Sequence, residues 1–374
     1  MSSLKRSAFS VPHFFPYFYN MQTTNVQQFL PRFARMTRQL GKAPLHVLAG
    51  DLGGTKTRLA LFEASEGRLQ VVDEQVYASR EYTSFPDVVK GFIGKQAGRE
   101  PQRICIGVAG PVIRGKVELT NLSRELNVTD IQQATGIPET SLINDLEATA
   151  YGLATLQNES LLTLHSGAGD NGGNMAIIAP GTGLGEAGLF WDGELYTPFA
   201  TEGGHCDFAP RNELDMELLE YLQEKYQIVS WERLVSGPGI YDTFKFLRDI
   251  RHMHVPDWLE EDLLKKDPAA VISGQAIEQK VSVCIKTMEL FVRYLAREAA
   301  NLVFKMKATG GLFVGGGIPP RITPLLQDNA FYHHYLQGDR LIELLASVPI
   351  HVISNDKAAL WGAAYYAVHQ QRVV

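Results

Sequence analysis

The sequence predicts a protein with two α/β lobes that face each other across a cleft. Short apolar runs typical of buried strands alternate with helix-like segments along the chain. In addition, a strand–glycine turn–strand unit occurs once in each half, at 48–62 and at 174–190. Because a glycine turn can direct backbone N–H groups at an anion, the two units indicate duplicated lobes that share one polyphosphate.

The bulk composition is that of an ordinary globular protein. The chain has 374 residues, of which 45% are hydrophobic and 20% charged. A net charge of −6 gives no reason to expect nucleic acid or an anionic membrane as a partner, and no apolar run is long enough to predict a transmembrane helix. Cys105, Cys206 and Cys284 lack the spacing of a zinc site or a disulfide framework, so a reducing compartment fits best.

Residues 1–44 differ from the rest of the chain. No Asp or Glu precedes Asp51, whereas Lys, Arg and Ser recur and aromatic residues cluster at 14–19. Such a composition resembles an organelle transit peptide, and 32–40 nearly matches a peroxisomal targeting signal. We favour an extension that is disordered or packed on a domain, in a cytoplasmic protein. Import into a plastid, mitochondrion or peroxisome-like organelle is the alternative.

The first glycine turn carries the groups expected of a phosphate and magnesium site. Its members are Asp51, Gly53, Gly54, Thr55 and Lys56. A carboxylate beside a phosphate is typical of Mg²⁺, here held through water. The segment resembles a P-loop, but Thr55 replaces the second glycine and a strand follows where a helix must begin. A hairpin turn without a ligand is the alternative.

A strand meets a helix at Asn144 and Asp145. The apolar run ends at Ile143, and helical periodicity begins at Leu146. One interpretation is structural, with Asn144 as the N-cap and Glu147 three residues later. The other is functional, because a carboxylate beyond a strand end can act as a general base.

The second glycine turn offers Gly181, Thr182 and Gly183. The spacing of Gly183, Gly185 and Gly188 also matches a dinucleotide-binding fingerprint. That fingerprint must open a helix, whereas the hairpin signal at 192–193 predicts another strand. We therefore reject the dinucleotide interpretation.

Two further segments offer groups for a polyol. Glu202 and His205 flank two glycines in a polar loop, where a carboxylate and an imidazole can accept several hydroxyl groups. A metal site there is not expected, since adjacent residues rarely bind one ion. Glu232 follows Ser230, which we expect to cap a helix that ends at the Gly-Pro-Gly of 237–239, so Glu232 serves either that helix or the same polyol.

The remaining elements are predicted from periodicity. Strands are expected at 70–77, 104–109, 311–314 and 350–354, a short hairpin at 112–119, and helices at 85–96, 214–226, 274–307 and 357–368. The last helix is rich in Ala and Gly, which favours close packing on the first lobe. Gly315 and Gly316 follow a buried strand and would permit the approach of a flat ligand such as a purine.

With these segments in order, the chain resembles the bacterial-type glucokinases over 45–368. The matching segments are 51–55, 143–146, 180–185, 202–205, 232–239 and 315–318. The resemblance implies a two-domain actin-like ATPase fold, also called ribonuclease H-like, with an interdomain cleft. A small domain would comprise 45–154 with 355–374, and a large domain 155–354.

The same resemblance implies phosphorylation of glucose to glucose 6-phosphate by ATP with Mg²⁺. Asp145 would be the catalytic base and a sugar ligand. The other sugar ligands would be Asn121, Asn144, Glu202, His205 and Glu232, although Ser123 and Arg124 follow Asn121 where relatives carry Trp. The related ROK kinases carry a cysteine-rich zinc motif soon after the corresponding histidine, and the absence of such a motif after His205 points away from that branch.

Several alternatives stay open at this point. Another hexose, or ADP or polyphosphate as donor, would use the same site. A homodimer is compatible with the sequence but not determined by it. A non-catalytic nucleotide-binding relative is the rival class, and the presence of Asp145 argues against it.

Overall fold

The first lobe is built on a five-stranded sheet of order β3-β2-β1-β4-β7. The structure is a computed structural model that describes residues 31, 33, 44–119, 124–168 and 172–369. The strands are β1 (Leu45–Leu52), β2 (Lys56–Ser65), β3 (Arg68–Ala78), β4 (Arg103–Val108) and β7 (Thr140–Asn144). β1 pairs antiparallel with β2 and parallel with β4, which pairs parallel with β7.

The second sheet repeats this arrangement, with order β11-β10-β9-β12-β13-β8. Its strands are β8 (Leu161–His165), β9 (Met175–Pro180), β10 (Leu184–Trp191), β11 (Tyr196–Thr201), β12 (Gly311–Val314) and β13 (Ile350–Ile353). β9 pairs antiparallel with β10 and parallel with β12, as β1 does with β2 and β4. The duplication inferred from the two glycine units is therefore confirmed.

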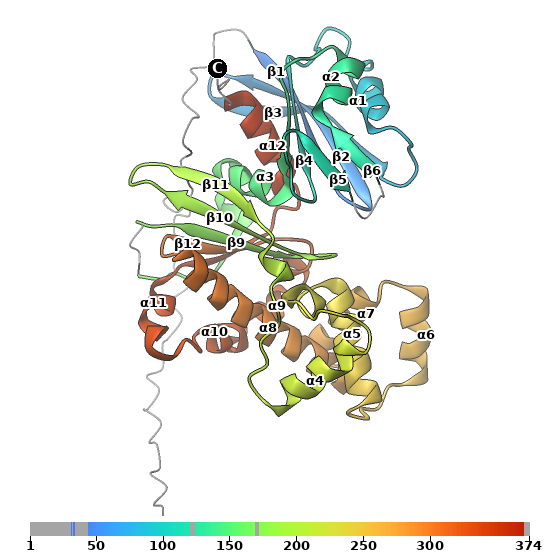
Figure 1. Ribbon diagram of the computed structural model, residues 1–374, viewed down its shortest axis with the longest axis vertical. Coiled ribbons are helices and arrows are strands. Elements are labelled where there is room, and N and C mark those ends of the chain that lie inside the picture. Colours follow the sequence, from blue (N-terminus) through green and yellow to red (C-terminus); the bar gives the residue numbers. More distant parts are fainter. Residues whose placement is uncertain (1–30, 32, 34–43, 120–123, 169–171, 370–374) are drawn as a thin grey trace, which may run out of the picture.

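Helices separate and cover the two sheets (Figure 1). α3 (Asp145–Gly152) and α12 (Ala358–His369) lie between the sheets: α12 contacts β1 and β4, and α3 contacts β9, β10 and β11. α1 (Phe85–Ile93) and α2 (Val128–Thr135) belong to the first lobe, beside the small hairpin of β5 (Lys116–Leu119) and β6 (Arg124–Asn127).

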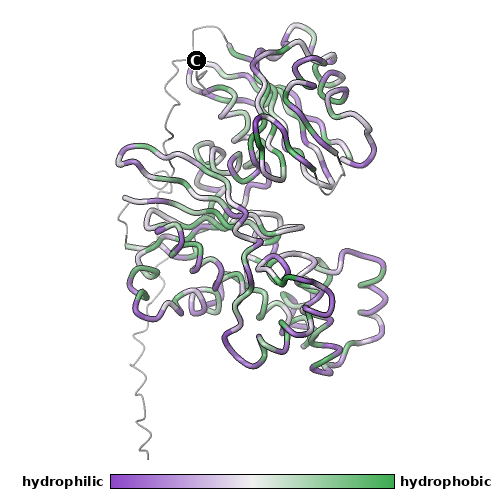
Figure 2. Tube along the Cα trace, in the orientation of Figure 1, coloured by the Kyte–Doolittle hydropathy of each residue, from purple (hydrophilic) through white to green (hydrophobic). Residues whose placement is uncertain are grey.

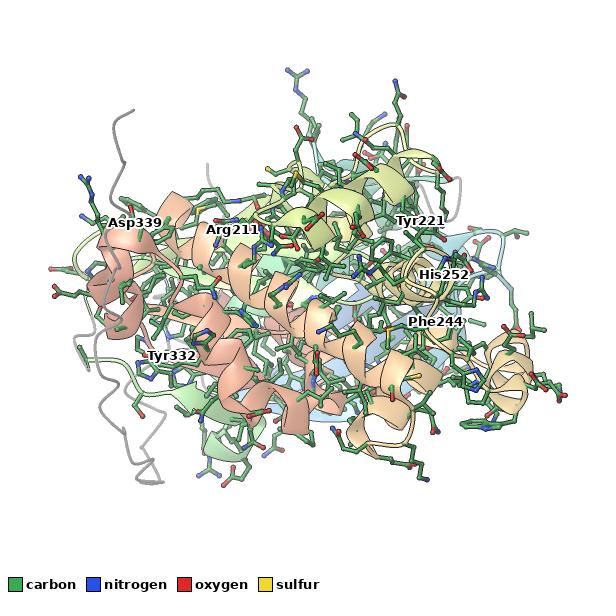
Figure 3. All side chains as sticks on the ribbon, turned by 90° about the horizontal axis from the view of Figure 1, so that it is seen from below. Arg211, Tyr221, Phe244, His252, Tyr332 and Asp339 are labelled. Atoms are coloured by element: carbon green, nitrogen blue, oxygen red, sulfur yellow. The ribbon has the colours of Figure 1, made fainter. Side chains whose placement is uncertain are left out.

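The far side of the second sheet carries the other helices (Figures 1 and 3). They are α4 (Glu213–Gln223), α5 (Gly237–Asp249), α6 (Asp257–Lys265), α7 (Pro268–Ile277), α8 (Ser282–Met306), α9 (Thr323–Gln327), α10 (Asn329–Tyr335) and α11 (Ile342–Ser347). α8 packs on β9 and on α5, α7 and α10, and Phe244 of α5 is fully buried in this layer. Hydrophobic segments follow the strands of both sheets, and hydrophilic ones the outer loops (Figure 2).

Three sequence predictions need correction. The hairpin expected at 112–119 is reduced to one bridge, Ile113 to Lys116, because the strand that follows pairs with β6 instead. The Gly-Pro-Gly at 237–239 begins α5 rather than ending a helix: Ser236 caps it and proline occupies the first turn, where no N–H is needed. The single helix expected at 274–307 is instead the end of α7 followed by α8, and the chain between them turns at Gln279, which adopts a positive φ of 55°.

One residue of the N-terminal extension is seen to pack on the folded lobes. Phe33 is 4% exposed and its ring lies 4.9 Å from that of Tyr151 and 5.9 Å from that of Tyr365. Most of the extension lies outside the described residues, and so does the targeting-like segment 32–40 apart from Phe33. Within the described part of the chain, no helix is long and apolar enough to cross a membrane.

The contact between α3 and α12 depends on glycine. A Cβ at Gly362 would overlap the carbonyl oxygen of Ala148, and a Cβ at Gly152 would overlap that of Ala358. The two backbones therefore touch, as the small-residue composition of the last helix predicts.

We expect Gly362→Ala to lower the free energy of unfolding by about 1–3 kcal/mol, because the helices must separate to admit a methyl group. Gly274→Ala is the matched control, since nothing lies within 4 Å of its Cβ position in α7, and it should be neutral or stabilising by about 1 kcal/mol. Urea unfolding measures both. Equal stability of Gly362→Ala and wild type would contradict the close contact.

Candidate active site

The junction of β7 and α3 presents Asp145. Asn144 is the N-cap: its Oδ1 accepts the N–H groups of Leu146 at 2.8 Å and Glu147 at 3.3 Å, and its Nδ2 donates to the Gly110 carbonyl at 3.2 Å. The capping prediction is thus confirmed, and it leaves Asp145 as the first helical residue. Asp145 keeps part of its side chain exposed, so it is available to a substrate.

Acidic groups from three segments converge at Asp145. Burial and, to a smaller extent, the neighbouring Asp51 carboxylate together raise the pKa of its carboxyl to about 7, against the opposing effect of the Leu146 N–H. Glu202 adds a smaller effect in the same direction. Because these interactions require proximity, the structure brings the first glycine turn, the strand–helix junction and the Glu202 loop to one place.

Asp51 lies one residue before the end of β1, opposite Arg58 of β2. Burial raises the pKa of Asp51 to about 6, while Arg58 lowers it and Asp356 raises it. Arg58 donates to the carboxylate of Asp356 at 2.6 Å and to its carbonyl at 2.8 Å. The sequence analysis missed Arg58 and Asp356. The register of the hairpin would have placed Arg58, but nothing in the sequence pairs it with a residue 298 positions away.

The first turn is anchored to the end of β3. The Gly53 N–H donates to the Lys56 carbonyl at 3.0 Å, and Ser79 donates from Oγ to the Gly53 carbonyl and from its N–H to the Thr55 carbonyl. Thr55 and Lys56 are exposed. Their hydroxyl and ammonium groups are therefore accessible at the edge of a fixed turn, and Gly54 continues it.

The second turn lies against the third glycine segment. Gly181 donates to the Gly183 carbonyl at 2.8 Å, and Thr182 between them is exposed. Gly316 has a φ of 83°, and a Cβ there would overlap the Pro180 carbonyl. The structure thus places Gly315 and Gly316 beside the second turn, as a shared nucleotide site requires.

Glu232 lies at the second turn. Its Oε2 accepts the Leu184 N–H at 3.0 Å, and a Cβ at Gly183 would lie 2.5 Å from that oxygen. Ser230 makes no capping hydrogen bond, and only a 3₁₀ turn follows it, so the helix expected there is wrong. The segment is nevertheless tied to the polar loop, since the Trp231 N–H donates to the Cys206 carbonyl at 2.9 Å.

Glu202 and His205 face each other across one 3₁₀ turn. Their side chains are more than half exposed, and His205 Nε2 lies 3.9 Å from Glu202 Oε2. We call residues 202–206 the Glu202–Cys206 loop. Its two polar side chains are open to a ligand, and the Glu202 carboxylate contributes to the raised pKa of Asp145. Asn121, the further sugar ligand expected from the sequence, lies outside the described residues.

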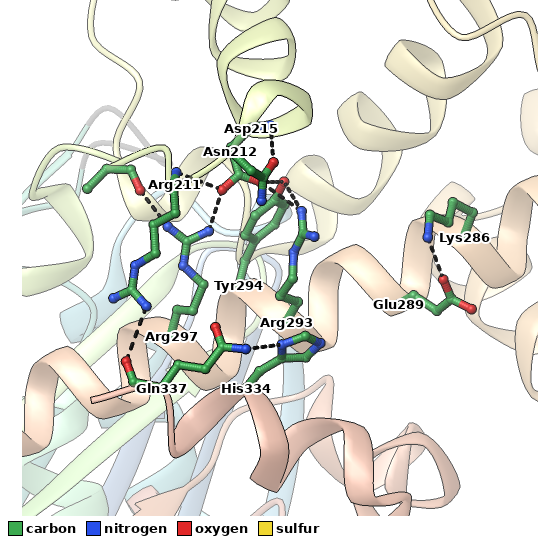
Figure 4. A network of polar contacts seen from close by, with 11 residues as sticks. Arg211, Asn212, Asp215, Lys286, Glu289, Arg293, Tyr294, Arg297, His334 and Gln337 are labelled. Carbon is green, nitrogen blue, oxygen red and sulfur yellow. Dashed lines mark hydrogen bonds and ion pairs between the residues drawn. The ribbon is translucent and has the colours of Figure 1, made fainter. Parts of the chain in front are cut away.

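A buried ionic network holds the chain that follows this loop (Figure 4). Asp215, fully buried in α4, accepts from Arg297 at 2.6 Å, from Arg293 at 2.7 Å and from Tyr294 at 3.0 Å. Although burial raises the pKa of Asp215, the Arg211 N–H and the two guanidinium groups hold it below its usual value. Arg297 also donates to the Ala209 carbonyl, which links the chain that follows the loop to α8.

The described residues contain no cluster of three or more His, Cys, Asp or Glu side chains that could enclose a metal ion. Two surface hollows of about 400 and 630 Å³ lie elsewhere in the first lobe, beside α12 and beside α1. Neither hollow is lined by Asp51, Asp145 or Glu202, or by the glycine turns. We therefore locate the candidate site from the chemistry of its side chains and not from the size of a hollow.

Asp145→Asn should raise the melting temperature at pH 8. The folded pKa of Asp145 is about 7 against an ordinary 3.8, so its contribution to stability is complete below pH 3.8 and is lost as the pH rises through 7. The difference from wild type should therefore shrink as the pH falls towards 4. Thermal unfolding followed by circular dichroism measures it.

Asp130→Asn is the control, because Asp130 is an exposed acid in the first turn of α2. A lower melting temperature for Asp145→Asn at pH 8 would show that the carboxylate stabilises the fold.

The fold and the site define a class. Two sheets of repeated topology, with glycine turns and an acidic residue where they meet, form the two-lobed architecture of actin-like ATPases and sugar kinases. Within that class the chain belongs to the glucokinase family, whose profile, described as Glucokinase, matches residues 48–370.

Individual relatives agree with this assignment. The glucokinase of Nostoc punctiforme is 38% identical over 335 residues, covering 86% of this chain and 98% of the relative. The glucokinase of a Synechocystis species is 37% identical over 352 residues, covering 88% and 99%.

Solved structures show the same fold. A glucokinase from an Antarctic psychrotroph has a TM-score of 0.74 at 30% identity, covering 86% of this chain and 98% of its own. A glucokinase from Balamuthia mandrillaris in complex with glucose has a TM-score of 0.76 at 24% identity, covering 92% and 98%. A ROK family glucokinase from Streptomyces griseus, in complex with glucose and AMPPNP, has a TM-score of 0.57 at 20% identity, covering 86% and 99%.

Proposed function

We propose that this chain is a glucokinase that transfers the γ-phosphoryl group of ATP to glucose and forms glucose 6-phosphate, with Asp145 as general base. Membership of the glucokinase family supports the reaction. The observation that carries the residue assignment is the position of the Asp145 carboxyl at the junction of β7 and α3, where burial, Asp51 and Glu202 raise its pKa to about 7. A raised pKa near neutrality is suited to a group that must accept a proton at physiological pH.

The proton transfer follows from this position. As the 6-hydroxyl oxygen bonds to the γ-phosphorus and the bond to the ADP oxygen breaks, the hydroxyl proton passes to the Asp145 carboxylate. The transferring phosphoryl group needs little covalent help, so positioning and electrostatic stabilisation supply most of the rate. The helix N-terminus of α3 holds Asp145 in place while Asn144 caps the helix.

The glycine segments supply the nucleotide site in this proposal. Gly53, Gly54, Thr55 and Lys56 in the first turn, and Gly181, Thr182 and Gly183 in the second, would bind the phosphates, and Gly315 and Gly316 the adenosine. Gly316 lies against the second turn, which supports the assignment of phosphates and adenosine to neighbouring segments. ADP or polyphosphate in place of ATP would use the same turns.

The residues present fit a magnesium ion that is bound largely by phosphates and water. Asp51 lies at the first glycine turn, and burial raises the pKa of its carboxyl. A bound cation would offset the cost of keeping this carboxylate charged. Mg²⁺ commonly takes only one or two protein carboxylates, so the lack of a larger cluster among the described residues is compatible with it. When bound, the ion would neutralise phosphate charge.

Glucose would be held by Glu202 and His205, with Asn144 and Asn121 as further ligands. Glu232 fits better as a support for the second turn, through Leu184 and Gly183, with its second carboxylate oxygen available to the sugar. The domain boundaries at 45–154 with 355–374 and at 155–354, a cytoplasmic location and a homodimer all stay predictions from the sequence.

Asp145→Ala should lower kcat for glucose by a factor of about 10²–10⁴, since a positioned general base contributes that much. A coupled assay of ADP release across a hexose panel measures it, with Asp130→Ala as the matched control. Turnover with another hexose would replace the substrate and keep the base. Wild-type turnover by Asp145→Ala would remove the assignment, and no turnover with ATP, ADP or polyphosphate would favour a nucleotide-binding protein without catalysis.

The pH dependence of kcat/KM should show an acid limb near pH 7. Only ionised Asp145 accepts a proton, so activity should fall as the pH drops through its pKa of about 7. Asp51→Asn removes the neighbouring like charge and should move the limb of the residual activity to lower pH. If the acid limb of the kcat/KM profile stays at the same pH in Asp51→Asn, a group other than Asp145 determines that limb.

A further inference from the structure

A buried carboxyl group lies directly behind the Glu202–Cys206 loop. Glu186 belongs to β10, where it pairs with Ile178 of β9 and Thr201 of β11, and it is only 1% exposed. No N–H or hydroxyl group of the described residues donates to either of its carboxylate oxygens. Burying a carboxylate without a donor is costly, so the group needs an explanation that the phosphoryl transfer does not supply.

The neighbour of this carboxyl is a second one. Glu186 lies beside Glu298 of α8, which is fully buried. Glu298 is already satisfied as an anion, because Lys305 donates to its Oε1 at 2.7 Å and Asn301 to its Oε2 at 2.8 Å. Two adjacent carboxyl groups cannot both ionise cheaply. The proton therefore belongs on Glu186, which then donates a hydrogen bond to Glu298 and is no longer unpaired.

The electrostatics agree with this assignment. Burial and the Glu298 carboxylate raise the pKa of Glu186 to about 8, against the opposing charge of Lys305. The charged or titratable groups that face the pair are Glu298 and Lys305 from α8 and, next to Lys305, Cys206 from the loop. Glu186 is thus neutral at pH 7 and acquires charge in mildly alkaline solution.

Glu186 also touches the loop that would bind the sugar. A Cβ at Gly203 would overlap the Glu186 Oε2, so the carboxyl group occupies the space that a side chain at Gly203 would need. The backbone beside this contact is fixed as well: Thr201 donates from its Oγ1 to the Glu186 carbonyl at 3.0 Å and accepts the Gly203 N–H at 3.3 Å. Any displacement of the Glu186 side chain therefore reaches Gly203, which lies between Glu202 and His205.

We propose that Glu186 is a positioning residue for hexose binding: its protonated carboxyl group, hydrogen-bonded to Glu298, supports Gly203 and so holds Glu202 and His205 in place for the sugar. The inference rests on the proposed function, because it concerns the hexose site. Ionisation of Glu186 places a second negative charge beside Glu298, which drives the carboxyl groups apart and disturbs the loop. Sugar affinity, rather than phosphoryl transfer, is the property that depends on this proton.

The test compares Glu186→Ala, Glu186→Gln and Glu194→Gln with the wild type. Glutamine keeps a neutral donor for Glu298 at every pH, whereas alanine removes it. Glu194 is exposed at the other end of the same hairpin and controls for the loss of one charge. The readouts are KM for glucose, KM for ATP and kcat from pH 6.5 to 9, and glucose dissociation constants from tryptophan fluorescence without nucleotide.

For the wild type and for Glu194→Gln, we expect the KM for glucose to rise by up to about tenfold between pH 7 and pH 9, as an unfavourable ionisation near pH 8 requires. Glu186→Gln should keep the low KM across this range. Glu186→Ala should raise it at least about fivefold at all pH values, which corresponds to the loss of one ordinary hydrogen bond, with the KM for ATP unchanged.

Three outcomes overturn the inference. One is a wild-type glucose KM in Glu186→Ala, and another is a wild-type pH response in Glu186→Gln, which would assign the titration to a group other than Glu186. A third is an equal change in the KM for ATP, which would indicate general loosening. If the wild type binds no hexose, the proposed function fails and this inference fails with it. If the wild type binds hexose and the Glu186 substitutions leave that binding unchanged, the inference alone is overturned.

Discussion

The backbone contact between α3 and α12 is the constraint on which the arrangement of this protein depends. Gly362 and Gly152 leave no space between the two helices, and α12 in turn packs on β1 and β4 of the first sheet. At the other side of α3, a Cβ at Gly185 would lie 2.5 Å from a Leu146 methyl group, so the second sheet meets the same helix. One short helix thus fixes how the two lobes face each other, and its first residue is Asp145.

This placement explains the electrostatics of the site. Burial opposes the ionisation of Asp145, and so do the like charges of Asp51 in the first lobe and Glu202 in the second. The same interactions that raise its pKa reduce the stability of the folded protein at neutral pH. Strongly raised carboxyl pKa values are common at enzyme active sites, and at Asp145 the rise comes chiefly from burial, with the like charge of Asp51 adding to it.

The supports of the site are also charged and buried. Asp215 with Arg293 and Arg297 fixes the chain beyond the Glu202–Cys206 loop, and Glu186 with Glu298 lies beneath the loop itself. Both rely on α8, whose fully buried face includes Arg297 and Glu298. The helix therefore does more than cover the second sheet, since its polar residues reach the segment that presents Glu202 and His205.

Much of this could be predicted from the sequence. The two glycine turns, the strand–helix junction at Asn144 and the duplicated lobes follow from local rules, because turns, caps and strand periodicity depend on residues close in the chain. The Gly-Pro-Gly at 237–239 shows the limit of such rules: the same residues can end a helix or begin one, and only the capping bond from Ser236 decides.

The sequence by itself determined the order of the elements, the residue types at each turn and the family to which the chain belongs. Only the tertiary structure decided which acidic residues share an electrostatic environment, that Arg58 meets Asp356, that Glu232 supports the second turn, and that Glu186 needs a proton. These features join residues far apart in the chain, and their energies depend on burial and distance. Neither quantity is encoded locally, because both arise when the two sheets and the helices between them pack together.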